Sequence, residues 1–239
     1  MNTTKRVSVW SGPRNVSTAL MYSFRSRADT VVVDEPLYGY YLERTDAPHP
    51  GKAEVLAAMD TDGERVVREV LLGQYSADTV MFKNMAHHLP GLTPTFLDEL
   101  NNVLLVRDPA EMLPSLAQEL PQPTLRDTGL QEQVGLLEEI LAVGKTPVVI
   151  EAKRLLQNPE SVLRELCRAL ALPFDPAMLS WPEGPKPEDG VWAKHWYKNV
   201  HASSTFAPYT PKTAPFPGHL KPLLEVCTPP YAKLLPYAL

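Results

Sequence analysis

The stretch Val7-Ser-Val-Trp-Ser-Gly-Pro-Arg-Asn-Val-Ser-Thr-Ala-Leu20 decides the fold. A short valine-rich run followed by glycine, proline and hydroxyl residues predicts a buried strand, a tight loop and a helix start. The N-terminus of a helix presents unpaired N–H groups and a positive dipole end, so such a loop binds phosphate readily. Gly12 permits the turn, Arg14 supplies charge, and Ser17 and Thr18 add hydroxyl donors.

This loop is not a Walker A loop, which would need glycine and lysine where Ser17 and Thr18 stand. An ordinary strand–helix turn with N-cap residues is the alternative interpretation. Residues 1–28 hold five basic side chains and no acidic one, which is the charge distribution a small anionic ligand needs. The sequence therefore predicts a phosphate-binding loop made of Gly12, Pro13, Arg14, Asn15, Ser17 and Thr18.

A second segment, Asn102-Val-Leu-Leu-Val-Arg-Asp-Pro-Ala-Glu-Met-Leu-Pro-Ser115, again joins a strand to a helix. The strand ends at Arg107, and Asp108, a proline and Glu111 at the third helical position mark the helix start. The planar fork of an arginine at a strand end suits phosphate, although Arg107 has an alternative in pairing with Asp108 or Glu111. We expect Arg107 and Ser115 to complete an anion clamp.

Short, continuous apolar runs recur along the chain and predict strands buried on both faces. They are Arg6–Trp10, Thr30–Asp34, Val80–Lys83, Val103–Val106 and Val148–Ile150. Strands that alternate with helices imply a parallel sheet covered by helices on both faces, which binds ligands at the carboxyl ends of its strands.

Two helix boundaries carry sequence signals of their own. Thr128 with Gln131 three residues later is a capping-box pairing for a helix that Gly144 closes. Asn158 followed by Pro159 is an N-cap and first-turn signature for a later helix. Cys167 lies on the leucine-rich face of that helix, so we expect it in the core.

The 239 residues fit one domain, 1–239, better than two. Within it, residues 173–239 hold thirteen of the 25 prolines and three of the four tryptophans. So much proline resists long helices and central strands. We therefore expect 173–239 to be an extended, aromatic-rich segment packed over the domain, where it can cover a site.

The composition excludes several classes. A net charge of −5 disfavours a broad nucleic-acid surface, and no apolar run approaches the ~20 residues of a membrane helix. The polar start, Met1 to Arg6, leads directly into a strand, and two cysteines give no disulfide framework. We expect a cytoplasmic protein that binds neither nucleic acid nor membrane.

The two segments together resemble the sulfotransferase family. Gly-Pro-Arg-x-x-Ser-Thr after the first strand is similar to the family loop for the 5′-phosphosulfate of 3′-phosphoadenylyl sulfate (PAPS), and Val-Arg-Asp-Pro with serine eight residues after the arginine is similar to its 3′-phosphate motif. The helix ending Ala-Leu-Ala-Leu-Pro-Phe-Asp175 resembles a late family helix. The resemblance spans most of residues 5–180 and implies a three-layer α/β/α fold of the P-loop nucleoside triphosphate hydrolase and sulfotransferase-like class.

The resemblance has departures. The family loop usually has glycine where Val16 stands and often lysine where Arg14 stands. Its third nucleotide element, a basic residue and glycine before a tryptophan, is matched loosely by Lys186 to Gly190 and Trp192.

The implied chemistry is transfer of a sulfonate from PAPS to a hydroxyl or amine of a small-molecule or carbohydrate acceptor, with no metal. The resemblance makes Arg14 the cation on the leaving phosphate and Lys83 a lysine near the sulfonate, although a solvated strand-end lysine is the alternative for Lys83. Either Glu35 or His88 is the base. We favour Glu35, which follows a strand directly, even though a simple ion pair with Arg14 would also explain it.

Other interpretations stay open. His87 and His88 as a metal pair are disfavoured, because no cysteine or carboxylate stands at ligand spacing. Tyr38, Tyr40 and Tyr41 either line an acceptor site or pack a helix on the sheet. The alternatives to a sulfotransferase are a small-molecule kinase, which lacks its Walker lysine here, and a non-catalytic nucleotide-binding module.

Overall fold

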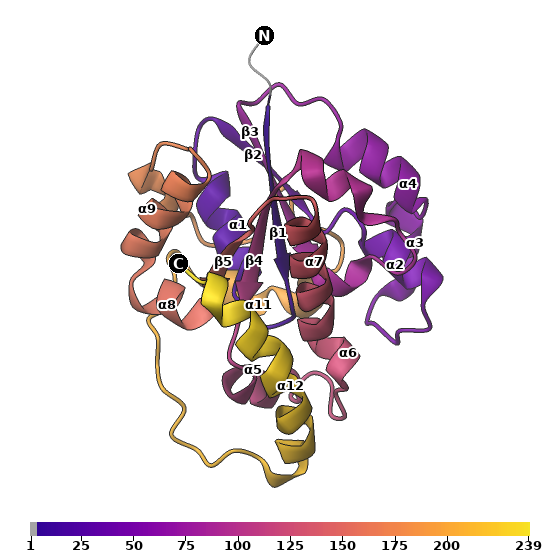
Figure 1. The fold of residues 1–239 in the computed structure, drawn as a ribbon, viewed down its shortest axis with the longest axis vertical. Helices are drawn as coiled ribbons and strands as arrows, with labels where there is room; N and C mark the ends of the chain where they lie inside the picture. The colour runs from indigo at the N-terminus through magenta and orange to yellow at the C-terminus, as the bar shows by residue number, and fades with distance from the viewer. Residues whose placement is uncertain (1–3) are drawn as a thin grey trace.

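The computed structural model describes residues 4–239, and Figure 1 shows its central sheet with helices on either side. All five predicted strands are present, each within two residues of its predicted bounds: β1 Lys5–Ser11, β2 Thr30–Asp34, β3 Thr79–Met85, β4 Asn101–Val106 and β5 Val148–Glu151. All pair in parallel, in the order β2-β3-β1-β4-β5. The predicted three-layer α/β/α fold with a parallel sheet is confirmed. The first part of the predicted polar start, residues 1–3, lies outside the described residues.

Helices follow the strands and give the chain its two outer layers. Those of the first half are α1 Ser17–Arg25, α2 Tyr38–Arg44, α3 Lys52–Ala58, α4 Gly63–Val66, α5 Pro109–Leu116 and α6 Leu125–Thr128. Those of the second half are α7 Leu130–Ala142, α8 Ala152–Gln157, α9 Pro159–Ala169, α10 Ala193–Trp196, α11 Lys198–His201 and α12 Lys221–Leu234. Short 3₁₀ turns, among them Ala86–His88 after β3, join some of these elements.

Each face of the sheet has its own apolar core. Alternate strand residues such as Val9 and Leu105 pack with α1, α8 and α9, where Cys167 is buried as predicted. The opposite set, which includes Trp10 and Leu104, packs with α5, α7 and α12. Burial of the sheet on both faces explains why its strands are continuous apolar runs rather than alternating ones.

The predicted capping box at Thr128 is wrong. The box belongs to the preceding short helix α6, where Thr124 and Asp127 exchange side-chain and backbone hydrogen bonds. Gly129, with φ 70°, then separates α6 from α7. The Thr128 hydroxyl instead donates to the Leu125 carbonyl within α6. Thr124 and Thr128 are each followed by a polar residue three positions on, Asp127 and Gln131, so both match the capping-box pattern.

The expectation that residues 173–239 lack long helices is also wrong for their last part. α12 runs for 14 residues through Pro229 and Pro230. The carbonyls that these prolines leave without an intrahelical partner belong to the exposed residues Glu225 and Val226, where the loss is cheapest because water can reach them. Upstream, residues 203–217 have almost no regular structure and form the long connection below the sheet in Figure 1.

Candidate active site

A cavity of about 550 Å³ opens at the carboxyl ends of the central strands. Its wall is built by the loops after β1, β2, β3 and β4 and by residues 192–207 of the C-terminal segment. The predicted catalytic and binding side chains that line it are Pro13, Arg14, Asn15, Ser17, Thr18, Glu35, Lys83, His88, Arg107 and Ser115. The sheet order therefore brings both halves of the predicted site into one cavity, as expected for strand ends of a parallel sheet.

The loop after β1 has an unusual backbone. Arg14 and Val16 both have left-handed φ values, 60° and 59°, and α1 begins directly afterwards at Ser17. An L-residue pays about 1–2 kcal/mol for this conformation, and β-branched valine is among the least suited to it. Val16 thus occupies a backbone geometry that glycine would adopt without strain. The loop keeps this geometry despite the valine, and strain of this kind is concentrated at functional sites.

Gly12 is needed for a reason that the sequence did not reveal. A Cβ atom at this position would lie 2.2 Å from the backbone oxygen of Thr128, so the loop after β1 and the end of α6 approach too closely for any side chain. Gly12 itself has no left-handed φ and does not line the cavity. The buried amide of Asn15 fixes the next part of the loop by donating to the Leu105 carbonyl at 3.0 Å.

Arg14, Arg107 and Ser115, which come from the two predicted segments, are linked to one another. The Nε of Arg14 donates to the Ser115 hydroxyl at 3.0 Å, and the Nη1 of Arg107 donates to the Arg14 carbonyl at 2.6 Å. Arg107 also lies 3.8 Å from Glu111, so the alternative ion pair forms as well. Asp108 caps α5 by accepting from the Ala110 amide, as predicted.

Lys212 adds a third positive charge here, and sequence reasoning missed it. Its Nζ donates to the Glu111 carbonyl at 2.7 Å, and the Tyr209 hydroxyl donates to the Glu111 carboxylate at 2.6 Å. Partial burial, followed by the nearby charge of Arg107, lowers the pKa of Lys212. We call Arg14, Arg107 and Ser115, which line the cavity, the anion half of the site; Lys212 lies beside it and outside the lining. Lys212 lies among the prolines of an irregular segment, where no periodic pattern marks it.

On the other side of β1, Lys83 is buried in the sheet with 2% of its side chain exposed. Its Nζ donates to Asp34 at 2.9 Å, to Glu35, and to the Tyr197 hydroxyl at 2.6 Å. These partners take all three donors of the ammonium group. The strand-end interpretation of Lys83 as a solvated lysine is therefore wrong, and Glu35 pairs with Lys83 rather than with Arg14.

The protonation of this cluster follows from its burial and its charges. Burial lowers the pKa of Lys83, but the carboxylates of Asp34 and Glu35 outweigh it and raise the pKa well above its ordinary value. Burial raises the pKa of Glu35, and the charge of Lys83 offsets this only in part. Burial and the Asp34 charge raise the pKa of Tyr197 too. The cluster thus holds a charged lysine, a neutral phenol and a carboxylate of increased basicity.

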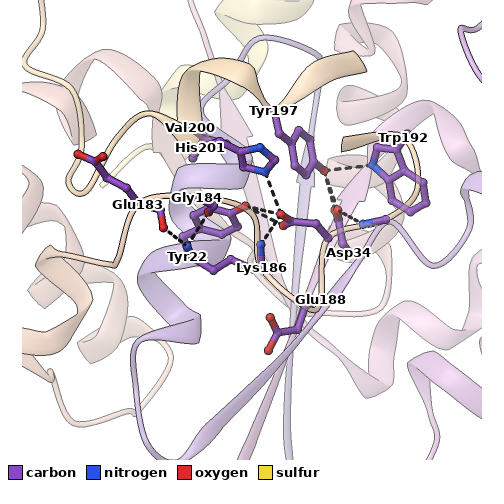
Figure 2. Close-up of polar contacts among 12 residues, drawn as sticks. Tyr22, Asp34, Glu183, Gly184, Lys186, Glu188, Trp192, Tyr197, Val200 and His201 are labelled. Atoms are coloured by element: carbon purple, nitrogen blue, oxygen red, sulfur yellow. Dashed lines mark hydrogen bonds and ion pairs between the residues drawn. The ribbon is translucent and has the colours of Figure 1, made fainter. Parts of the chain in front are cut away.

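Tyr197 and Asp34 are residues of this cluster that sequence reasoning did not assign. The Tyr197 hydroxyl shares its proton between the two Asp34 oxygens, at 2.7 and 2.9 Å, and accepts from the indole N–H of Trp192 at 3.2 Å (Figure 2). Asp34 stands at the end of β2, next to the predicted Glu35, so the strand-end rule could have found it. Tyr197 lies too far along the chain for any local signal.

The predicted third nucleotide element takes a different position. The Nζ of Lys186 donates to the carbonyls of Pro182 and Gly184, both at 2.6 Å, and Lys186 does not line the cavity. Figure 2 shows the contact with Gly184. Its backbone and the hydroxyl of Tyr22 both bind Asp189. Lys186 therefore folds the C-terminal segment against α1 instead of presenting its charge to a ligand.

Glu35 and His88 differ as candidate bases. Glu35 has a left-handed φ of 43°, and its amide donates to the Lys83 carbonyl at 2.7 Å. His88 is 0% exposed and its Nδ1 lies 3.9 Å from a Glu35 oxygen. Burial lowers the pKa of His88 well below its ordinary value, so His88 is the weaker base. Within residues 4–239 no group of three metal-ligand side chains is found, and no helix is long and apolar enough to cross a membrane.

Fold and cavity together define a P-loop-like α/β protein whose first strand is followed by a loop that lines the cavity. The family model for the sulfotransferase domain matches residues 5–234. The chain therefore belongs to the sulfotransferase domain family, whose members are transferases. Solved structures support the fold: it is similar to the sulfotransferase domain of a Synechococcus PCC 7002 olefin synthase, with a TM-score of 0.55 and 16% identity over 95% of both chains. It is also similar to a sulfotransferase domain of the curacin biosynthetic pathway, with a TM-score of 0.51 and 15% identity over 95% of this chain and 99% of the other.

Two Arabidopsis thaliana proteins share much higher identity. They are named branched-chain-amino-acid aminotransferase-like proteins 1 and 2 and are 42% and 38% identical to this chain over 225 and 226 residues. The matches cover 93% and 94% of this chain but 40% of each relative. The chain thus spans about two fifths of the length of the curated relatives it matches.

Proposed function

We propose that the chain transfers a sulfonate group from PAPS to a hydroxyl or amine of a small acceptor, with Glu35 as the general base. The observation that carries the proposal is that one cavity holds the anion half and, across the end of β1, a buried carboxylate of raised pKa. A nucleotide phosphate fits the first group and an acceptor proton fits the second. We also propose that residues 1–239 act as one domain, because residues 192–207 contribute to the same wall.

The proposed step is an in-line displacement at sulfur. The acceptor oxygen or nitrogen forms the new bond to sulfur, the bond from sulfur to the phosphate oxygen breaks, and 3′-phosphoadenosine 5′-phosphate leaves with that electron pair. The acceptor proton passes to Glu35. Arg14 stabilises the charge that develops on the leaving phosphate, and Arg107 with Ser115 holds the 3′-phosphate.

The charge of the buried cluster favours this proton transfer. Asp34, Glu35 and Lys83 together carry one uncompensated negative charge, which is costly to bury. Protonation of Glu35 removes it. Since the ammonium of Lys83 has no donor left for the sulfonate, we propose that Lys83 positions Glu35 rather than contacting the transferred group.

A transfer assay with labelled PAPS tests the base. Glu35→Gln keeps the shape of the side chain and is expected to lower kcat by about 10²–10⁴-fold, the usual contribution of a general base. His88→Ala is expected to lower it far less. Glu69→Gln, at an exposed residue outside the cavity, is the matched control. Full activity of Glu35→Gln would contradict the proposal.

Binding of 3′-phosphoadenosine 5′-phosphate must be unchanged in these variants, so that a loss of rate reports chemistry. The same nucleotide separates the proposal from its alternatives. Stronger thermal stabilisation of the protein by ATP with Mg²⁺ than by 3′-phosphoadenosine 5′-phosphate would favour the kinase. Nucleotide binding with no transfer to any acceptor would leave the non-catalytic module.

A further inference from the structure

The half of the cavity opposite the anion half is walled by aromatic rings. It contains Tyr38, Tyr41, His49, His88, Trp192 and Trp196, which we call the aromatic half. Tyr38 and Tyr41 come from α2, directly after Glu35, while the tryptophans come from the C-terminal segment. The rings contact one another: that of His88 stacks on those of Tyr38 and Tyr41 with centroids 4.9 and 4.7 Å apart, and Trp192 meets Tyr38 edge-on at 5.1 Å.

The sheet order separates the two halves. Arg14 and Arg107 follow β1 and β4, which are neighbours, whereas Glu35 and His88 follow β2 and β3 on the other side of β1. Phosphate groups held by Arg14 and Arg107 therefore do not fill the aromatic half, which remains open beside the proposed base. The molecule that enters this half must bring its reactive hydroxyl to Glu35.

The histidines of the aromatic half are neutral, and the carboxylates beside them have hydrogen-bond partners. Burial lowers the pKa of His87 to about 3, and it lowers those of His88 and His49 too, so these rings are neutral near pH 7. Lys83 pairs with Glu35 and with Asp34, and Asp34, the second carboxylate of this cluster, does not line the cavity. Asp127, which also lines the cavity, accepts the backbone and hydroxyl hydrogen bonds of Thr124. Each carboxylate among these groups therefore already has a hydrogen-bond partner in the protein.

Polar groups without partners mark one point of this half. Within the described residues neither ring nitrogen of His88 has a hydrogen-bond partner, although the side chain is fully buried and lines the cavity. Buried polar atoms are rarely left so, because each costs about 1–3 kcal/mol. A single hydroxyl between the Nδ1 of His88 and the Glu35 oxygen 3.9 Å away would bond to both and satisfy one of the two nitrogens.

We propose that the acceptor is an uncharged aromatic alcohol, whose planar ring packs against the aromatic half and whose hydroxyl lies between Glu35 and His88. This inference rests on the proposed function and names its acceptor class. A sugar would leave several hydroxyls against apolar rings, which is costly without compensating hydrogen bonds. A quaternary ammonium suits an aromatic cage, but the carboxylate nearest these rings, Glu35, is already paired with the Lys83 ammonium, and a quaternary ammonium has no hydrogen to donate to it.

A matched acceptor pair tests the proposal. 2-Naphthol and decahydro-2-naphthol share a carbon skeleton and a hydroxyl but differ in planarity, while N-acetylglucosamine and choline represent the other classes. We expect kcat/KM for 2-naphthol to exceed that for each of the others by at least tenfold. A preference for the saturated alcohol, the sugar or choline would overturn the acceptor class.

Two variants locate the acceptor in the aromatic half. Tyr41→Leu and Trp196→Leu are expected to raise the KM for 2-naphthol about tenfold, while Tyr237→Leu, at an exposed tyrosine outside the cavity, leaves it unchanged. Calorimetry with 3′-phosphoadenosine 5′-phosphate shows whether each variant is folded. Equal weakening of nucleotide and 2-naphthol binding would assign these rings to the donor's adenine and overturn the proposal.

A binding measurement distinguishes failure of the proposed function from failure of the inference about the acceptor. The affinity of 2-naphthol for the protein saturated with 3′-phosphoadenosine 5′-phosphate is measured without any turnover, and we expect it to be at least tenfold tighter than that of decahydro-2-naphthol. Selective binding without transfer would contradict the proposed function while supporting a site for planar alcohols. Equal binding of the two alcohols would overturn the inference whatever the activity.

Discussion

Tyr197 and Asp34, 163 positions apart in the chain, are joined by hydrogen bonds of 2.7 and 2.9 Å inside the candidate active site. The same phenol accepts from Lys83 at 2.6 Å. One side chain of the C-terminal segment thus completes the polar cluster that β2 and β3 begin. The C-terminal segment is therefore part of the framework of the candidate site and not only a cover over it.

Removing this phenol oxygen tests the cluster. Tyr197→Phe leaves Asp34 and Lys83 buried with one partner fewer, and a buried polar group left unsatisfied costs about 1–3 kcal/mol of unfolding free energy. Urea unfolding measures the loss. Tyr75→Phe, which removes one hydrogen bond to the Val70 carbonyl at a half-buried position, is the control and should lose less. Equal losses would show that Tyr197 has no special role in the cluster.

The anion half makes a prediction about nucleotide affinity. Arg107→Ala is expected to weaken 3′-phosphoadenosine 5′-phosphate by about 1.5–3 kcal/mol, or roughly 10–150-fold, the scale of a charge-assisted hydrogen bond. Lys212→Ala removes a more exposed charge and should cost about 0.5–1 kcal/mol. Calorimetry measures both. Arg68→Ala, at an exposed arginine outside the cavity, should have no effect.

Arg107 also supports the Arg14 carbonyl, so its loss could act on the loop as well as on the nucleotide. Ionic strength separates the two, because a direct phosphate contact weakens as salt rises. If Arg107→Ala shows the same salt dependence of nucleotide affinity as the unmodified protein, a direct contact by Arg107 is contradicted.

The backbone of Val16 predicts opposite results for two substitutions. Proline fixes φ near −65°, which is incompatible with the observed 59°, so Val16→Pro is expected to weaken nucleotide binding more than tenfold. Glycine adopts the left-handed region freely, so Val16→Gly should bind within about threefold of the unmodified chain. The comparison uses the same calorimetric titration. Similar affinities for both variants would show that the loop conformation does not matter for binding.

The buried histidines make folding stability depend on pH. In the unfolded chain a histidine takes up a proton near pH 6.5, whereas burial holds the pKa of His87 at about 3 in the folded protein. The unfolded state then binds more protons as the pH falls below 6.5, so the free energy of unfolding decreases there. Each such histidine contributes up to about 1.4 kcal/mol per pH unit.

The measurement is the slope of unfolding free energy between pH 6 and pH 5. His87→Gln is expected to reduce that slope by about 1.4 kcal/mol per pH unit. Glu35, whose pKa burial raises, acts in the opposite sense at lower pH, but it is present in both proteins and cancels in the difference. An unchanged slope in His87→Gln would contradict the neutral state of the ring.

The fold and the anion half follow closely from the sequence because their signals are local. Valine-rich strands, Gly12, and the Arg107–Asp108 strand end each lie within a few residues of the feature they predict. The parallel pairing of the strands then follows from burial of both faces. Local signals also misled: the cap at Thr128 was assigned one helix too late, and Pro229 and Pro230 did not prevent α12.

The rest of the site depends on contacts that no local pattern encodes. Lys83 has the sequence of an ordinary strand residue, and its environment becomes visible only when Tyr197 arrives from the C-terminal segment. Lys186 shows the reverse case, since its motif suggested a ligand while its Nζ binds the carbonyls of its own loop. Long-range pairing, and not residue type, decides which of these two lysines belongs to the site.

The position of Tyr197 has a consequence for synthesis of the protein. It follows Lys83 by 114 residues, so at about 5–20 residues per second a ribosome needs roughly 6–23 seconds between the two. Throughout that interval the nascent chain holds Asp34 and Lys83 without the phenol that joins them. The strands can pair early, but the polar cluster is complete only after the last fifth of the chain has begun to be synthesised.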